Sequence, residues 1–350
     1  MSTKTNLGPL PHWDLTNVYQ SLDGRDFQED VKKVNQLIDD LDQYIDENNI
    51  SRIGVTTESV VDLAKRTSGY LDRMNALLRL YQTLQAYVLS FITTDSYNSE
   101  AKRIMSELDT LSVRIKHQKV LFQGWLGSIY QDPEKLSQIF LQGGSPVEHR
   151  FFLGETAEQS RFLMSENEES LASELALSGS RSWRKLQGVV TSQLKVPFER
   201  DGITEDLPIT VIINLCTDPN RDIRQRAYEA ELEAWKTVSE PLAACLNGVK
   251  GSVVTLYKRR GREDALHQAI DQARISRETL EVMMGTMRDY FPAFRRYLKS
   301  KASRLGIEKL SWWDLMAPMG KSDKRYSYDE SHELILDHFG QFSDRLKGLA

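Results

Sequence analysis

Long stretches in which apolar residues recur every three or four positions dominate this chain, and their spacing limits its fold more than any other feature. The residues of 27–45 follow the i, i+3/i+4, i+7 pattern of one helix face. A longer run of the same kind covers 60–91, and a third covers 104–115. Short polar connections separate the three runs. We therefore expect three long amphipathic helices packed as an antiparallel bundle.

The length of the chain predicts more than one core. A single hydrophobic core stops growing at roughly 250–300 residues, and this chain has 350. We expect an N-terminal helical subdomain over residues 1–180 and a second helical subdomain over residues 181–350.

Side chains that cap helices mark several helix starts. Asp132-Pro133 and Asp218-Pro219 each place an N-cap aspartate before a proline at the first helical position. Ser276 is expected to cap a further helix, with Ile275 and Leu280 placed as a hydrophobic staple.

The helix after Ser276 is expected to end near Gly306 and to be kinked by Pro292. Its three methionines, Met283, Met284 and Met287, lie at helical spacing. We predict that they belong to the core, with a ligand-binding patch as the alternative.

One segment favours strands. Residues 189–196 are rich in β-branched side chains and partly alternating, and Asp201-Gly202 is a turn signal. This predicts a small antiparallel hairpin near 189–208. The run 209–215 fits a strand or a buried helix equally well on periodicity alone. Gly143-Gly144-Ser145-Pro146 is expected to be a loop between helices.

Charge and cysteine content exclude several classes of function. The net charge is −5, and the densest basic cluster, Lys258-Arg259-Arg260, breaks at Gly261. We therefore expect neither nucleic acid nor a membrane as a partner. Cys216 and Cys245 each lie among apolar neighbours, which predicts buried, reduced thiols. The N-terminus has no apolar signal-peptide region, so we expect a cytoplasmic protein.

The last residues predict an unfinished helix. Ser343-Asp344 is typical of a helix start, with Leu346 and Leu349 as apolar positions. The sequence stops at Ala350, and we expect no capping glycine there. Because an isolated helix needs roughly 12–15 residues to be even marginally stable, this segment indicates a truncated chain.

The histidines offer one apparent zinc motif. Zinc peptidases of the thermolysin type place two histidines at i and i+4 on a helix, with a glutamate beside the first as general base. Here His332-Glu333 is followed by His338, and the i+4 position is Leu336. Six residues turn a helix by about 600°, which leaves the two rings about 240° apart. We expect these two histidines to lie on the surface.

No other chemistry stands out. His12, His117, His149 and His267 occur singly, so structural roles are expected for them. The chain has no G-x-S-x-G elbow, no P-loop and no G-x-G-x-x-G. We predict no catalytic and no metal-binding residue within 1–350, and the residues that bind substrate cannot be chosen from the sequence.

The order of local patterns along the chain nevertheless resembles the oligoendopeptidase F family, relatives of thimet oligopeptidase. The fragments that carry the resemblance are His12-Trp13-Asp14-Leu15 with Val18-Tyr19; Leu177-Ser178-Gly179-Ser180 with Trp183 and Leu186; Asn214-Leu215 with Asp218-Pro219-Asn220-Arg221-Asp222-Ile223-Arg224 and Ala227; Leu246-Asn247-Gly248-Val249-Lys250-Gly251 with Arg260-Gly261; Arg274-Ile275-Ser276-Arg277-Glu278-Thr279-Leu280; Phe294-Arg295-Arg296-Tyr297 with Lys301-Ala302 and Leu305-Gly306; and Trp313-Asp314-Leu315 with Ala317-Pro318. Two features depart from the family. Arg262 stands where an aromatic residue usually follows the Arg-Gly pair, and the His-Glu-x-x-His motif is absent.

The resemblance implies a mainly α fold, the first half of a thimet-oligopeptidase-like architecture, with a catalytic domain beyond residue 350. In the complete enzyme, zinc held by two histidines and a glutamate would activate a water for hydrolysis of short oligopeptides. The helical portion would form one wall of a channel that admits short unfolded peptides.

Two alternatives remain open. One is a free-standing helical module that binds protein partners, which should not expose a large unpaired apolar face. The other is a complete hydrolase that uses His332.

Overall fold

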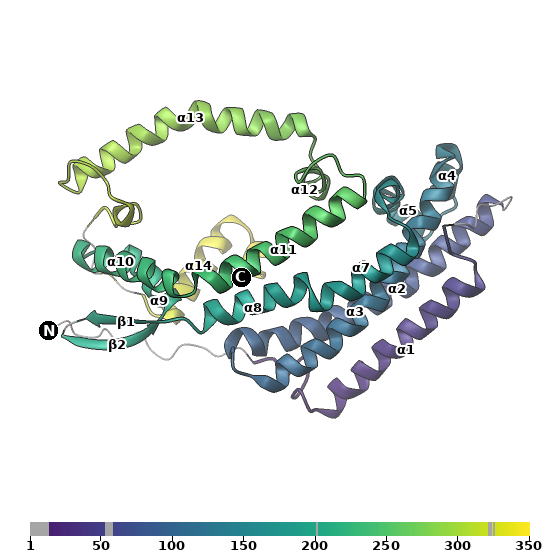
Figure 1. Ribbon diagram of the computed structural model, residues 1–350, viewed down its shortest axis with the longest axis horizontal. Helices are drawn as coiled ribbons and strands as arrows, with labels where there is room; N and C mark the ends of the chain where they lie inside the picture. The colour runs from purple at the N-terminus through teal and green to yellow at the C-terminus, as the bar shows by residue number, and fades with distance from the viewer. Residues whose placement is uncertain (1–13, 53–58, 201, 321–323, 325) are drawn as a thin grey trace.

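The computed structural model describes residues 14–52, 59–200, 202–320, 324 and 326–350. The fold is mainly helical, with one two-stranded antiparallel sheet (Figure 1). The elements, in chain order, are α1 Arg25–Glu47, α2 Val60–Thr94, α3 Ser99–Tyr130, α4 Pro133–Phe140, α5 Ser145–Glu148, α6 Arg150–Gln159, the 3₁₀ turn η1 Ser160–Phe162, α7 Glu166–Ser178, α8 Ser180–Ser192, β1 Lys195–Arg200, β2 Ile203–Pro208, α9 Ile209–Asn214, the 3₁₀ turn η2 Leu215–Thr217, α10 Arg221–Thr237, α11 Ser239–Arg259, α12 His267–Ala273, α13 Arg277–Arg304, the 3₁₀ turn η3 Trp312–Asp314, α14 Tyr328–Phe342 and α15 Asp344–Lys347.

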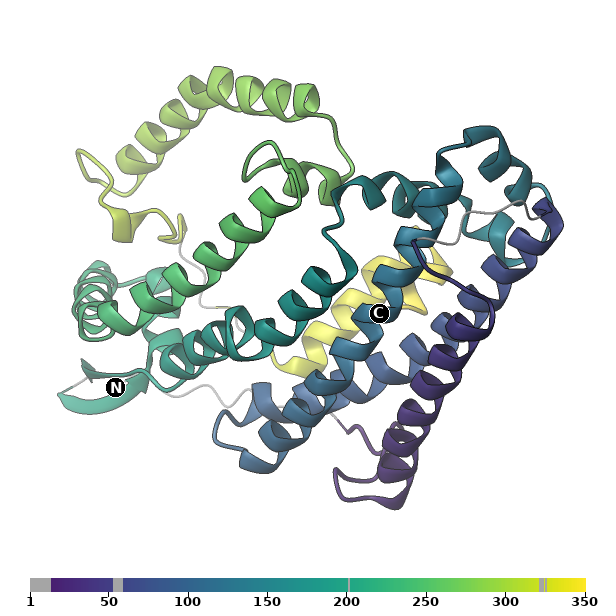
Figure 2. The same ribbon diagram turned by 45° about the vertical axis from the view of Figure 1, so that its right-hand side comes forward.

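The predicted bundle is confirmed. Helices α1, α2 and α3 lie side by side and pack on one another (Figures 1 and 2). The helix α1 buries five side chains of one face, Phe27, Val34, Ile38, Leu41 and Ile45. Full burial of such a side chain stabilises the fold by about 1.5–3 kcal/mol, so this stripe alone fixes which way α1 faces.

Helices α7, α8 and α11 connect the bundle to the rest of the chain. The helix α7 packs on α3, and α8 packs on α11. The last two helices approach closely at Gly248, where a Cβ atom would overlap the indole of Trp183. A glycine at this position therefore sets the distance between α8 and α11.

The hairpin is confirmed, but the prediction that its first strand begins at 189 is wrong. Strand β1 begins at Lys195, and its partners run from Lys195 opposite Pro208 to Arg200 opposite Ile203. Residues 189–192 are the last turn of α8, where Val189 and Val190 are half-buried. Packing of α8 against α11 outweighs the β preference of the two valines, because that preference is weak and depends on context.

A second, smaller core lies beneath the hairpin. Val196 and Phe198 point inward and pack with Ile209, Ile212 and the α10 residues Ala227 and Ala234. The ambiguous run 209–215 is resolved as the short helix α9 followed by η2.

The start of α4 at Asp132-Pro133 is confirmed, since Asp132 accepts a hydrogen bond from the Lys135 N–H. The predicted start at Asp218-Pro219 is wrong by two residues. The helix α10 begins at Arg221, with Asn220 as its N-cap. The Asp218 carboxylate instead accepts from the Asn220 N–H at 2.8 Å and so shapes the turn before the helix.

Two smaller expectations change. Ser145 and Pro146 open the short helix α5 and are not part of a loop, whereas Gly143 and Gly144, at positive φ, form the connection. Cys245 is buried as predicted, but Cys216 is only half-buried; both are free thiols.

The expectation that no glycine caps the last helix is also wrong. Ser343 caps α15 as predicted, but Gly348 occupies its C-cap position.

No helix within the described ranges is long and apolar enough to cross a bilayer.

Candidate functional surface

The helix α13 is the most unusual element of the chain. Ser276 caps it by accepting a hydrogen bond from the Thr279 N–H, as predicted, and it ends where Gly306 adopts a φ of +70°. Figure 1 shows α13 as an arch above α11 that includes Pro292. Only Lys301 and Ala302, in its last turn, are buried.

The prediction that the α13 methionines belong to the core is wrong. Met283, Met284 and Met287 are 51%, 42% and 54% exposed. The spacing identified an amphipathic helix correctly, but no element of the described chain covers its apolar face. We define the α13 face as the exposed apolar residues on one side of this helix: Met283, Met284, Met287, Tyr290, Phe291, Phe294 and Tyr297.

An exposed apolar surface of this size marks an interaction site. Further large apolar side chains are exposed on α11 and α14, among them Leu246, Val254, Ile335, Phe339 and Phe342.

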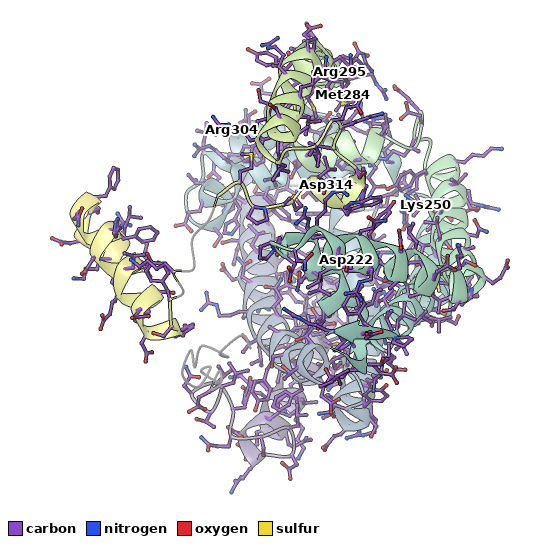
Figure 3. All side chains as sticks on the ribbon, turned by 90° about the vertical axis from the view of Figure 1, so that its left-hand side faces the viewer. Asp222, Lys250, Met284, Arg295, Arg304 and Asp314 are labelled. Carbon is purple, nitrogen blue, oxygen red and sulfur yellow. The ribbon has the colours of Figure 1, made fainter. Side chains whose placement is uncertain are left out.

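A buried ion-pair network holds the C-terminal end of α13. Arg224 of α10 donates from Nη2 to Asp314 Oδ1 at 3.0 Å, and Arg221 donates from Nη2 to Asp314 Oδ2 at 3.0 Å. Asp314 is fully buried and Arg224 nearly so. The Ser311 N–H also donates to Asp314 Oδ2 at 3.1 Å. Figure 3 shows Asp314 beneath the α13 residues Met284, Arg295 and Arg304.

Lys301 links this network to α13. Its buried ammonium donates to the Leu315 carbonyl at 2.6 Å, one residue after Asp314. The Trp313 ring packs on Tyr228 of α10, and the Arg221 guanidinium lies over the Trp313 ring. We call Arg221, Arg224, Lys301, Trp313 and Asp314 the junction cluster. It joins α10 to two later segments of the chain, the last turn of α13 and η3.

The charge of Asp314 is fixed by its partners. Burial alone raises the pKa of this carboxyl, but the hydrogen bonds from Arg221, the Ser311 N–H and Arg224 outweigh burial, and the pKa is lowered from its ordinary value of 3.8. Asp314 is therefore ionised near neutral pH and compensates two guanidinium groups.

The N-terminal end of α13 is held by surface ion pairs. Arg277 donates to Asp264 Oδ2 at 2.8 Å, and Arg274, just before the helix, forms a two-pronged pair with Glu155 of α6. The apolar middle of the helix is thus suspended between two anchored ends.

Arg262, the departure from the family pattern, forms an unexpected contact. Its guanidinium lies 3.6 Å from the Phe162 ring centroid, close to the Gln159 amide oxygen (2.6 Å) and in a short ion pair with Asp271. The arginine thus stacks on an aromatic ring where the family usually has an aromatic residue, and it ties α12 to α6 and η1.

A further buried pair joins α7 to α11. Arg260 donates two hydrogen bonds to Glu169, at 2.8 and 2.6 Å. Burial raises the pKa of Glu169, but the Arg260 hydrogen bonds and charge outweigh burial and leave the pKa below its ordinary 4.5.

The structure places the two histidines of the apparent motif on the exposed surface of α14, as predicted. His332 lies near the Tyr328 ring, and His338 Nδ1 contacts the Leu334 carbonyl. His117, His149 and His267 lie near Glu166, Asn75 and Asp271 respectively. His12 lies outside the described residues.

Within the described part of the chain, no group of three or more His, Cys, Asp or Glu side chains could hold a metal ion. The absence of catalytic and metal-binding residues from the whole chain stays a prediction.

Comparison with known proteins bears on this surface, because residues 214–349 match the model of Peptidase family M3. This match covers α10, α11, α13 and the junction cluster. The chain is similar to the oligoendopeptidase F peptidases. It is 22% identical over 311 residues to the group B oligopeptidase PepB of Streptococcus agalactiae, covering 83% of this chain and 51% of that protein. It is also 22% identical over 329 residues to the oligopeptidase PepF of Bacillus subtilis, covering 93% and 46%.

The fold agrees with this similarity. The crystal structure of oligoendopeptidase-F from Enterococcus faecium superposes with a TM-score of 0.70 at 14% identity, covering 91% of this chain and 62% of that one. The resemblance and the fold class inferred from the sequence are thus confirmed. The chain spans about half the length of the curated relatives it matches.

Sequence reasoning missed the junction cluster. Arg221, Arg224 and Asp314 all lie in the fragments that resemble the family, but the sequence alone does not pair them. One signal was available. Two arginines three residues apart lie on one face of a helix, and Asp314 was the only acidic residue of its own fragment.

Proposed function

We propose that residues 1–350 form the N-terminal, substrate-channel portion of a zinc endopeptidase that hydrolyses short oligopeptides. The observation that carries the proposal is the α13 face. It lies within the part that matches the peptidase family, and no described element of this chain covers it. A catalytic domain that continues from this portion would bury it.

The half-length match to oligopeptidase relatives supports the same reading. The partners of the complete enzyme would be short unfolded peptides, and its compartment the cytoplasm.

Zinc chemistry would belong to the catalytic domain. The described residues offer no group of donors that fits a zinc ion, and His332 and His338 are six residues apart and exposed. The described residues would therefore take no direct part in the zinc chemistry. What its residues contribute is a wall. Buried ion pairs fix α10, α11 and the C-terminal end of α13 in place, and surface ion pairs hold its N-terminal end, so that the surface between them has a fixed shape.

The test is the coding sequence after the codon for Ala350. We expect a His-Glu-x-x-His motif and a later glutamate ligand within the next domain length, roughly 100–200 residues. The longer polypeptide should cleave quenched fluorescent peptides but not folded proteins, and residues 1–350 alone should cleave neither. A stop codon directly after Ala350 would instead favour the free-standing interaction module. Peptide cleavage by residues 1–350 that is lost on His332→Ala would favour the complete hydrolase.

A further inference from the structure

The chain contains a second helix with an exposed apolar face, and its charge is opposite to that of α13. The helix α14 carries four acidic side chains, Asp329, Glu330, Glu333 and Asp337, and no lysine or arginine. Its apolar residues Tyr328, Ile335, Phe339 and Phe342 are spaced by seven, four and three positions and so share one side. All four are exposed, Phe342 to 84%.

The helix α13 is the complement of α14. It has seven basic and three acidic side chains, and from Tyr290 to Arg304 it has five basic ones and no acidic one. Arg288, Arg295 and Lys299 fall within about 40° of one another around the axis, beside the α13 face, at 100° per residue. None of these three has an ion-pair partner among the described residues.

The basic side chains of α13 and the acidic side chains of α14 also lie on the same side of their apolar stripes. We call Arg288, Arg295 and Lys299 the basic row of α13. At 100° per residue around the helix axis, this row lies roughly 90–130° to one side of the centre of the α13 face. Asp329 and Glu333 of α14 lie roughly 100–140° to the same side. When two helices pack antiparallel, the flanks that lie on the same side of their apolar stripes face each other. An antiparallel pair would therefore bring the basic row against these two acids while both apolar faces are buried.

Within one chain the two helices do not meet. In Figure 3, α14 stands apart from the body of the chain, while α13 lies at the top of the same view. Among the described elements, α14 packs chiefly on α15. Its apolar side is thus free to meet another molecule.

We propose that two copies of this chain form a reciprocal dimer in which α14 of each copy covers the α13 face of the other. Exchange of the same element in both directions closes the assembly with two-fold symmetry and leaves neither face exposed. The proposal concerns residues 1–350 by themselves and goes beyond the proposed function. A catalytic domain packed on α13 would compete with the dimer.

The available apolar area is sufficient. One contact would cover seven aromatic side chains, four on α13 and three on α14, each about half exposed or more. A fully buried aromatic residue loses about 150–250 Å², so one contact removes on the order of 500–900 Å². Two contacts approach the roughly 1,200–2,000 Å² of a stable interface.

The experiment measures the molar mass of the purified chain by light scattering after size exclusion, over a range of concentrations. The wild type should approach twice 40.2 kDa. The double variants Arg295→Glu/Lys299→Glu, on α13, and Asp329→Lys/Glu333→Lys, on α14, should each raise the dissociation constant at least about tenfold, because like charges then face each other. Reversal of two exposed lysines of α1, Lys32→Glu/Lys33→Glu, is the matched control and should leave the dimer intact.

A mixture of the two double variants tests whether α13 of one copy contacts α14 of the other. In a mixed dimer each reversed α13 meets a reversed α14, so the mixture should regain the dimer mass that each variant loses alone. A mixture that remains monomeric would overturn the proposal. A wild type that is monomeric at every concentration would also overturn it, and this is the result expected if α14 folds onto α13 of its own chain. Phe294→Glu should abolish the dimer even in mixtures, and circular dichroism will verify that each variant is folded.

Discussion

Removal of the Asp314 carboxylate is the most direct test of the structural argument. In the junction cluster this one side chain accepts from Arg221, Arg224 and the Ser311 N–H. Asp314→Ala would leave the buried Arg224 guanidinium with backbone carbonyl partners only, those of Asp218, Pro219 and Trp313.

The magnitude follows from burial. Asp314 is fully buried, and Arg224 is 4% exposed. Loss of one partner of a buried pair costs about 3–5 kcal/mol, because the remaining charge stays desolvated. Arg221 is nearly half exposed, so water can solvate it after the change. We therefore place Asp314→Ala near the lower end, about 3 kcal/mol.

Asp222→Ala on the same helix is the matched control. Asp222 pairs with Arg226 four residues later, and both side chains are exposed. Such a pair contributes only about 0.3–0.5 kcal/mol. Figure 3 shows both aspartates.

Hydrogen exchange read by mass spectrometry localises the effect. Amides of residues 311–317 and of the last turn of α13 should exchange faster in Asp314→Ala, since Lys301 is anchored on the Leu315 carbonyl. Urea unfolding should shift by the same free energy. Equal exchange and unfolding in Asp314→Ala and Asp222→Ala would refute the claim that the buried network anchors α13.

Three further predictions concern the joints between helices. Gly248→Ala should destabilise the chain by about 1–3 kcal/mol, because the added methyl group overlaps Trp183. Gly251→Ala, three residues later in open space, should stabilise the chain by up to about 1 kcal/mol. The thermal unfolding temperatures of the two variants should therefore shift in opposite directions. The pKa of Glu169 is lowered in the folded chain, so the ionised carboxylate contributes to the free energy of unfolding above its ordinary pKa of 4.5. This contribution is lost as the pH falls through the lowered pKa. Glu169→Gln should remove that part of the pH dependence of urea unfolding. Arg262→Ala should destabilise the chain by about 1.5–3 kcal/mol, the contribution of a hydrogen bond to a charged group, because Asp271 remains partly exposed. Limited proteolysis near α12 should become faster. Arg262→Lys should rescue the variant poorly, because lysine cannot both stack on Phe162 and bridge Asp271 and Gln159; a full rescue by lysine would show that charge alone matters there.

The sequence predicted the elements whose signals are local. Amphipathic periodicity identified α1, α2 and α3, and the Ser276 cap fixed the start of α13 correctly. The start of α10 was misplaced because Asp218 and Asn220 are both good capping residues. The geometry of the turn, in which the Asp218 carboxylate binds the Asn220 N–H, decides between them.

Burial and pairing were harder to predict, because they depend on contacts between distant segments. The valines at 189 and 190 favour a strand, but they complete α8 because that helix packs on α11. Arg224 and Asp314 are 90 residues apart, and no local pattern links a buried arginine to its carboxylate. The same limit left the substrate-binding residues unassigned.

The α13 methionines show how a wrong prediction can still be informative. A helix with a wide apolar stripe is stable mainly because something covers that stripe. The periodicity of α13 therefore predicts a partner, and the sequence reasoning assumed that the partner lay within residues 1–350. The structure leaves the stripe exposed while it anchors the N-terminal end of the helix by ion pairs and the C-terminal end by the hydrogen bond from Lys301 to the Leu315 carbonyl. The covering surface must then come from outside this arrangement of one chain. A catalytic domain and a second copy of the chain can be told apart. Only the second copy requires that the acidic side chains of α14 lie opposite the basic row of α13. Only the catalytic domain requires further sequence after Ala350.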